Sequence, residues 1–449
     1  MRFASLGVFG CVLAGTFSLI AGQSGKPAVP VVQFDGATVI DTYCAACHDG
    51  RRRSPSGVVL EELNVTRIPA NLELWARAYR QLQAGAMPPV GSPRPDRAVY
   101  DSLLVSIEQA WSNGAAKPAE FATSQEIAGR LATLLWNGVP DASLLQDAQG
   151  NRLTEPATLE RQIRRMLADE RAEAFVSSFL FPYLELDKLS NADPDKKHFP
   201  DYDPSLRDSL ARETQLFLLS QLRDNRDPVE LWSADYTFLN EQLARHYGVA
   251  GVTGSQFRRV QSSPERAGLL GQGSVLMVTS RHQHGVDAGY TTPATRAKWV
   301  RLHFFGAPLP NGFPGAEPVK PELPITPQTR TLPGEPCVTC HRNFFPIGYA
   351  LENFDPIGRW RTQDQLGPVD ASGAFVDGTP TDGVIELRKV LLQYPEAFRT
   401  TLAEKLLVHV AGSRSTPETL FRTRQILRGT KDTRWTALIA AVVRTKTGG

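Results

Sequence analysis

Two Cys-x-x-Cys-His motifs constrain this chain more than any other feature of its sequence. Their residues are Cys44, Cys47 and His48 in the first motif and Cys337, Cys340 and His341 in the second. This spacing is the attachment pattern for c-type haem. One helical turn directs both thiols to the porphyrin edge, and the adjacent histidine reaches the iron as the proximal ligand. We therefore expect two covalently attached haem c groups, with His48 and His341 as iron ligands.

Two alternatives exist for the paired cysteines. One is a thioredoxin-like redox dithiol, and the other is a zinc site built from all four cysteines. A redox dithiol does not require a histidine directly after its second cysteine, and export of the chain favours covalent haem attachment. The fifth cysteine, Cys11, lies in the N-terminal apolar run. No mature cysteine is then left for a disulfide between distant parts of the chain.

The N-terminus carries the pattern of a secretory signal. Met1 and Arg2 precede an almost uncharged stretch, 3–22, which gives way to polar residues from Gln23. This pattern predicts a signal peptide over 1–23 and a periplasmic or otherwise exported protein. An uncleaved membrane anchor is the alternative, because the run approaches the ~20 apolar residues of a spanning helix. No second run of that length follows, so no other membrane span is expected.

The remaining composition is that of an ordinary globular chain with several domains. It has 449 residues, of which 41% are hydrophobic, and its 49 basic and 47 acidic side chains nearly balance. A balanced charge disfavours disorder and a nucleic-acid partner. Phosphate-binding glycine loops, a His-Glu-x-x-His zinc signature and a Gly-x-Ser-x-Gly nucleophile elbow are not found.

A methionine follows the first motif in the segment Gly85-Ala86-Met87-Pro88-Pro89. A methionine in a proline-stiffened loop after a helix is how small cytochromes present a thioether to the iron, and His/Met ligation raises the reduction potential. We expect Met87 to be the second axial ligand of the first haem. The alternative is that Met87 only fills the core, as expected for Met166 and Met277.

The second motif offers no such ligand, because no methionine follows His341. Its sixth ligand is then a histidine, another side chain, an upstream methionine such as Met277, or none. The available histidines are His198, His246, His282, His284, His303 and His409. His409 interrupts an apolar helix, where a core histidine is the commoner explanation. His282 and His284 lie in a polar loop, and spacing alone does not choose among these residues.

Hydrophobic periodicity predicts a mainly α fold. Apolar stripes at helical spacing occur at 38–47, 72–84, 96–111, 127–136, 159–168, 172–184, 205–222, 239–247, 385–393, 398–411 and 417–427. Nine prolines between 306 and 336 indicate an extended segment that leads to Cys337. The expected domains are a class I-like cytochrome c domain at 30–115, a helical domain at 119–271, a second haem module at 272–369 and a C-terminal helical domain at 370–447.

Several sequence blocks carry a family resemblance. Residues 43–48, Trp75 and 85–96 resemble the small cytochrome c domain of large exported bacterial proteins. The blocks 165–169, 234–240, 349–355, 358–361, 370–373 and 404–407 resemble the multidomain family catalogued as domains of unknown function 1592, 1588 and 1585. The resemblance implies an exported haem protein, but the family has no settled biochemical role.

The chain departs from that family at two places around the second motif. Phe344 and Phe345 replace the usual Met-Asp before the Pro-Ile-Gly stretch, and the loop 281–290 is longer than usual. Family analogy is therefore weakest at the second haem.

Three functions are compatible with these observations. The first is electron transfer to a redox partner protein, for which the run 51–53 of three arginines offers a steering patch or only a solvated face. Arg359 and Arg361 are candidate partners of haem propionates or ordinary surface ion pairs. The second function is a di-haem peroxidase or oxidase whose second iron is open, with His282, His284 or His409 as the acid or base. The third is a haem-bearing scaffold of a larger exported assembly. No small-molecule substrate is indicated.

Overall fold

A computed structural model describes residues 36–48, 58–60, 68, 70–114, 120–280, 291, 293–308, 345–364 and 367–446. The fold is mainly helical, as the sequence predicts. Within these residues, no helix is both long enough and apolar enough to cross a membrane. The expected signal peptide, the polar loop at 281–290 and most of the proline-rich segment lie outside the described residues.

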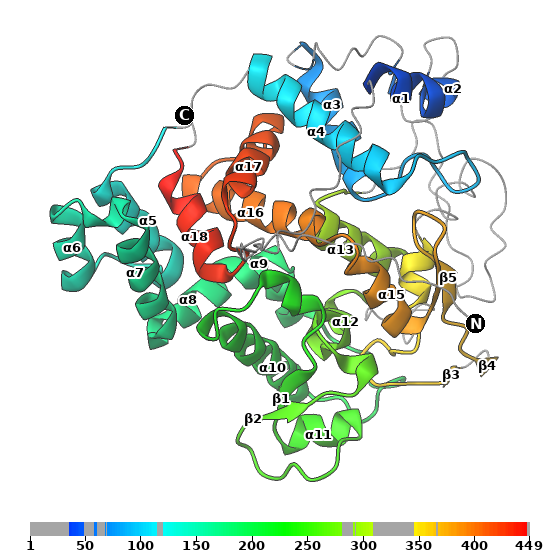
Figure 1. The fold of residues 1–449 in the computed structure, drawn as a ribbon. Coiled ribbons are helices and arrows are strands. Elements are labelled where there is room, and N and C mark those ends of the chain that lie inside the picture. Colours follow the sequence, from blue (N-terminus) through cyan, green and yellow to red (C-terminus); the bar gives the residue numbers. More distant parts are fainter. Residues whose placement is uncertain are drawn as a thin grey trace, which may run out of the picture.

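The N-terminal module consists of four helices that pack around a core of their own (Figure 1). They are α1 (Gly36–Tyr43), α2 (Ala45–His48), α3 (Leu72–Gln83) and α4 (Arg97–Gly114). The stripe predicted for α3 is confirmed, because Trp75 and Tyr79 are buried one turn apart. On α4, Leu103, Ile107 and Trp111 complete the same core.

Helices fill the middle of the chain. They are α5 (Ser124–Trp136), α6 (Ala142–Gln149), α7 (Pro156–Ala168), α8 (Glu173–Phe175), α9 (Phe181–Tyr183), α10 (Pro204–Arg223), α11 (Glu241–Tyr247), α12 (Gly273–Val278) and α13 (Pro293–Phe305). Short 3-10 turns connect them at Arg152–Thr154 (η2), Glu170–Ala172 (η3), Leu186–Asn191 (η5), Pro228–Trp232 (η6), Pro264–Arg266 (η7) and Leu269–Gly271 (η8). A π-helical turn at Val176–Leu180 (η4) joins α8 to α9 just before Pro182. Helix starts follow local chemistry: Thr123 forms a capping box with Glu126, and Asp203 caps α10 ahead of Pro204.

Four helices close the chain: α15 (Gly383–Leu391), α16 (Pro395–Ala411), α17 (Pro417–Gly429) and α18 (Trp435–Arg444). They share one large core with the middle helices and α13. In Figure 1, α16 runs through the centre of the molecule, with α13, α17 and α18 around it, and each of these three helices contacts it. Residues from all three predicted domains, 119–271, 272–369 and 370–447, contribute to this core.

The strands form three antiparallel pairs: β1 (Tyr236–Leu239) with β2 (Arg258–Gln261), β3 (Gln363–Asp364) with β4 (Gly367–Pro368), and β5 (Ser372–Ala374) with β6 (Pro380–Asp382). The predicted helix over 239–247 is wrong at its start. Leu239 ends β1, and Asn240 caps α11 by accepting a hydrogen bond from the Leu243 amide at 3.0 Å. An asparagine cap between a strand and a helix explains the boundary.

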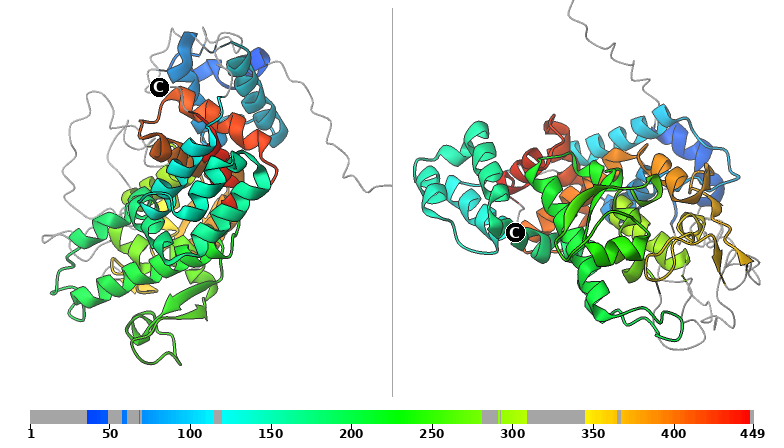
Figure 2. Two further views of the ribbon diagram at one scale, coloured as in Figure 1. Left: turned by 90° about the vertical axis from the view of Figure 1, so that its left-hand side faces the viewer. Right: turned by 90° about the horizontal axis from the view of Figure 1, so that it is seen from below.

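The N-terminal module is fixed against the C-terminal helices, as both views in Figure 2 show. Leu420 and Phe421 of α17 insert into its core, and the Phe421 ring lies 5.6 Å from those of Tyr79 and Trp111. Beside this contact, Arg80 of α3 makes a bidentate ion pair with the buried Glu404 of α16, with N–O distances of 2.7 and 2.8 Å. The module therefore has a defined orientation on the rest of the protein.

Candidate haem-attachment site

The first motif forms the helical turn that haem attachment requires. The amides of Cys47 and His48 both donate to the Cys44 carbonyl, at 3.1 and 3.0 Å. This turn joins α1 to α2 and places the two thiols and the imidazole within one helical turn. Cys44 is half-buried, Cys47 is exposed, and both are free thiols. The geometry agrees with the predicted thioether positions.

The imidazole of His48 is held by a backbone partner. Its Nδ1 donates to the Val58 carbonyl at 2.9 Å, and the Leu60 amide donates back to the His48 carbonyl at 2.8 Å. Because a carbonyl only accepts, this bond places the ring proton on Nδ1 and the lone pair on Nε2. Metal-ligating histidines are oriented by such a bond, which fixes the tautomer and raises ligand basicity.

Two side chains shape the Met87 loop. Tyr100 donates its hydroxyl to the Met87 carbonyl at 2.7 Å. Arg94 donates to the Gly85 carbonyl at 2.6 Å and also to the Pro88 carbonyl. Gly85 adopts a positive φ of 64°, and a side chain there would also collide with the Tyr394 hydroxyl. Met87 itself is half-buried within this clamped loop.

Tyr100 also connects the Met87 loop to the cysteine motif. Burial raises the pKa of Tyr100 to about 12, Arg94 opposes the increase, and Cys44 adds to it. Tyr100 is therefore within electrostatic reach of Cys44 while it binds the Met87 backbone. The structure thus brings together the predicted attachment turn and the loop that carries the predicted methionine ligand.

The thiol of Cys44 lacks the character of a redox dithiol. Burial, with a smaller contribution from Cys47, raises its pKa to about 11. Reactive thiols in redox motifs have lowered pKa values. Among the described residues, no group of three or more His, Cys, Asp or Glu side chains is arranged to hold a metal ion. The four-cysteine zinc alternative involves Cys337 and Cys340, which the structure does not describe.

The second motif, with Cys337, Cys340 and His341, lies outside the described residues, but the chain on either side is placed. Residues 345–349 form a helical turn whose Gly348 lies directly against the Pro293 backbone of α13, where a Cβ would stand 1.9 Å from the carbonyl oxygen. Only glycine allows this approach. The segment after the motif is therefore packed on α13.

A buried charge cluster lies beneath these chain ends. Arg296 of α13, fully buried, donates to the Leu351 carbonyl at 2.5 Å and lies 3.3 Å from Glu352. Arg361 also pairs with Glu352 at 3.3 Å. Arg359 binds Asp201 at 3.5 Å and His246 at 3.3 Å. Both arginines considered for haem propionates thus have protein partners.

The histidines considered as ligands have different surroundings. His246 has both ring nitrogens engaged, by the Ile357 carbonyl at 2.7 Å and by Arg359, and burial lowers its pKa to about 4. His198 contacts Asp195 at 3.3 Å. His303 is buried between Trp299 and Tyr183, and burial lowers its pKa to about 3.

His409 differs from its prediction: it is exposed, with its ring against Phe179, rather than in the core. His282 and His284 lie outside the described residues. Met166 and Met277 are fully buried, which confirms their predicted packing role.

Sequence reasoning did not identify the residues that hold the site. The supporting contacts are hydrogen bonds that involve main-chain carbonyls, made by Val58, Arg94 and Tyr100. Such contacts produce no recognisable residue spacing in the sequence. The nearest available signal was the block 91–96, in which Arg94 follows the methionine loop between two prolines.

Comparison with family models gives two matches. Residues 122–249 match the family described as a protein of unknown function, DUF1592, and residues 266–364 match the one described as a protein of unknown function, DUF1588. No curated protein matches the chain, and neither does any solved structure. The N-terminal module lies outside both matches, and the third expected domain, 1585, stays a prediction. The chain therefore contains two of the three predicted domains of unknown function, 1592 followed by 1588.

Proposed function

We propose that this protein is an exported di-haem c-type cytochrome that transfers electrons to a redox partner protein. The observation that carries the proposal is the hydrogen bond from His48 Nδ1 to the Val58 carbonyl. It fixes the ring that follows the two cysteines in the tautomer required of an iron ligand. The clamped Met87 loop, linked through Tyr100 to Cys44, supports it independently.

The residues of the N-terminal module suit the haem in distinct roles. Cys44 and Cys47 would form the thioether bonds, His48 would bind the iron through Nε2, and Met87 would supply the thioether sulfur. When bound in this way, haem supplies one-electron redox chemistry at a potential raised by the methionine. Arg94 and Tyr100 hold the backbone of the methionine loop.

The docking of the N-terminal module supports transfer within one protein. The ion pair between Arg80 and Glu404 and the insertion of Phe421 fix the module on the α16–α17 pair. A fixed module keeps a constant distance to the remainder of the chain, which a flexible tether would not. The second haem, at Cys337, Cys340 and His341, remains part of the proposal on the basis of its motif alone.

The mass of the intact protein, purified from an exporting host with the cytochrome c maturation system, tests the proposal. Two covalently bound haems are expected, with one lost in the double variant Cys44→Ser/Cys47→Ser and the other lost in Cys337→Ser/Cys340→Ser. Two haems retained in either double variant, or none in the wild type, would refute attachment at that motif. Loss of the methionine-to-iron charge-transfer band in Met87→Ala identifies the ligand.

Spectra then separate electron transfer from the enzymatic alternative. Electron transfer predicts two low-spin, six-coordinate haems that do not change on adding peroxide, carbon monoxide or cyanide. A high-spin signal that is present in the wild type and in Met87→Ala alike would instead assign an open iron to the second haem and favour a peroxidase or oxidase. A protein whose haems stay unreactive and exchange no electrons with any donor would favour the scaffold.

A further inference from the structure

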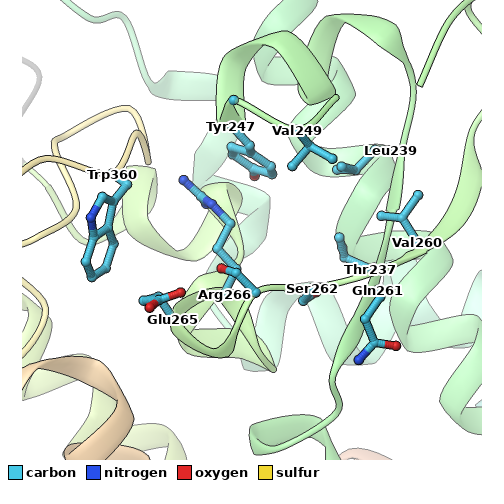
Figure 3. A pocket seen from close by; sticks show the side chains of 12 residues that line it. Thr237, Leu239, Tyr247, Val249, Val260, Gln261, Ser262, Glu265, Arg266 and Trp360 are labelled. Carbon is cyan, nitrogen blue, oxygen red and sulfur yellow. The ribbon is translucent and has the colours of Figure 1, made fainter. Parts of the chain in front are cut away.

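A cavity of about 330 Å³ opens where the two matched families meet. Thr237, Leu239 and Tyr247 of the first family line it, together with Val260 on β2. Arg266 and Trp360 come from the second family, and Figure 3 shows the guanidinium of Arg266 between Trp360 and Tyr247. Among the described residues, none of the first cysteine motif lines this site.

Arg266 is a buried cation without a carboxylate partner. Its side chain is 7% exposed, and no carboxylate of the described residues lies within the 4.0 Å of an ion pair. Its guanidinium donates to the carbonyls of Gly271 at 3.1 Å and Gly358 at 2.7 Å. It also lies 3.7 Å from the centre of the Tyr247 ring. Glu213, Asp355 and Glu265 act on it only from beyond ion-pair distance. A buried guanidinium without a carboxylate in direct contact is costly, so this site favours an anion that binds it directly.

The guanidinium keeps donors for such an anion. Arginine has five N–H groups in a planar fork that matches a carboxylate, and the two carbonyl bonds use two of them. The nearby Glu213 is a poor counter-charge, because burial raises its pKa to about 7 despite its hydrogen bonds to Thr237 and Tyr247. It is therefore only partly ionised at neutral pH.

A second polar group in the cavity lacks a partner. The hydroxyl of Ser262, just after β2, is buried and makes no hydrogen bond. An unsatisfied buried hydroxyl is unfavourable unless a ligand completes it. Gln261 and Ser263, which flank Ser262, are exposed at the rim. A ligand of this cavity would therefore need one anionic group for Arg266 and one hydrogen-bonding atom for Ser262.

Glu265 also lines the cavity, beside Arg266, and the other walls are mainly apolar and include an exposed indole. Leu239, Val249 and Val260 line one side, and Trp360 is 42% exposed. The other six tryptophans of the chain are buried, which makes the exposure of Trp360 exceptional. Its ring is held edge-on against Phe354, with centroids 5.1 Å apart. A rigid exposed indole beside aliphatic side chains suits a flat apolar ligand body.

We propose that this cavity binds a small planar carboxylic acid of largely apolar body, with its carboxylate on Arg266 and its ring on Trp360. Ser262 would donate its hydroxyl to the same ligand. The site does not depend on haem attachment. It assigns a binding role to the junction of two families of unknown function.

Calorimetric titration of the full-length protein with sodium benzoate tests this proposal, with benzamide as the neutral analogue of the same shape. Benzoate is expected to bind, and benzamide roughly tenfold more weakly or worse, because it lacks the charge that Arg266 requires. Absence of heat with millimolar benzoate, or equal affinity for benzamide, would overturn the proposal.

Two variants and a matched control locate the site. Trp360→Ala changes a partly exposed side chain and is expected to weaken benzoate binding by roughly tenfold while the thermal transition is retained. Arg266→Gln is expected to abolish the preference for benzoate over benzamide. Arg258→Gln removes an equal charge from the exposed edge of β2 and should leave both affinities unchanged. Unaltered binding in Trp360→Ala, or an equal loss in Arg258→Gln, would contradict the assignment.

Discussion

The carboxylate of Glu108 on α4 and the guanidinium of Arg424 on α17 form a nearly buried ion pair, with 3.1 Å between Oε1 and Nε. Arg428, on the next turn of α17, binds the other carboxylate oxygen, and Tyr79 donates its hydroxyl to Oε1 at 2.6 Å. Glu108 is thus the shared acceptor that joins the N-terminal module to the C-terminal helices.

Removing this carboxylate should weaken the docking of the module. Glu108→Gln removes the buried counter-charge of Arg424, whose side chain is 11% exposed, and leaves only the exposed Glu396 at 3.4 Å. Breaking a buried pair from one side costs about 3–5 kcal/mol, and we expect a loss of about 3 kcal/mol in urea unfolding. The matched control is Asp101→Asn on the same helix, whose pair with Arg97 is more than half exposed on both sides and should cost well under about 1 kcal/mol.

Amide hydrogen exchange distinguishes docking from general destabilisation. Glu108→Gln should accelerate exchange in α3, α4 and α17 more than in α10, which is distant from the contact between the N-terminal module and α17. Equal acceleration throughout would show that Glu108 does not act at this junction.

The same residue predicts an acid-sensitive junction. Burial alone would raise the pKa of Glu108, but Arg424, Arg428 and Tyr79 outweigh it, so the pKa is lowered from 4.5. A lowered pKa contributes stability that is present above the unfolded-state value and is lost as pH falls through the folded-state value. We expect the wild type to lose stability below about pH 4.5 more steeply than Glu108→Gln. If the free energy of unfolding falls equally steeply with decreasing pH in the wild type and in Glu108→Gln, this prediction is wrong.

Tyr100 is expected to position the predicted methionine ligand. Tyr100→Phe removes the hydrogen bond to the Met87 carbonyl, which should cost about 1 kcal/mol in the clamped loop. In the haem-loaded protein, added imidazole should then displace the methionine several-fold more readily, as followed by loss of its charge-transfer band. Ser106→Ala on the same helix removes only a bond to the Ser102 carbonyl and should leave imidazole affinity unchanged.

Most helices were predictable from the sequence, including the central α16, but α13 and α18 were not predicted. The stripes of α3, α4 and α10 fall on the predicted ranges because each has one buried face. α13 gave no stripe, because it buries the polar side chains of Arg296, Arg301 and His303 among aromatic residues. α18 does carry an apolar stripe, because Trp435, Leu438 and Ile439 are buried at helical spacing, but this stripe was missed.

The residues proposed to bind haem can be proposed from the sequence, but the residues that support them cannot. The motif Cys44–His48 and Met87 can be recognised from residue type and spacing in the sequence. The acceptor of the His48 proton is a carbonyl, which every residue has, so sequence cannot select Val58. The insertion of Phe421 into the N-terminal core depends on a contact between segments more than 300 residues apart, which helical periodicity does not encode.

Glu213 on α10 predicts an opposite pH dependence from that of Glu108. It is 1% exposed, and burial raises its pKa from 4.5 to about 7, although Thr237 and Tyr247 each donate a hydroxyl to it at 2.6 Å. A raised pKa contributes stability that is fully present below the unfolded-state value and is lost as pH rises through the folded-state value. Ionisation of Glu213 should therefore remove up to about 3 kcal/mol between pH 4.5 and about 7.

Glu213→Gln tests this, because glutamine resembles the protonated acid in shape and carries no charge. The variant should match the wild type near pH 4.5 and exceed its stability above neutrality, as measured by urea unfolding across that range. Asp208→Asn, at an exposed position on the same helix, is the control and should show no such divergence. If the stability difference between Glu213→Gln and the wild type stays constant with pH, Glu213 is ionised throughout this range. Its negative charge would then neutralise part of the Arg266 cation, so this result also bears on the anion preference of the neighbouring cavity.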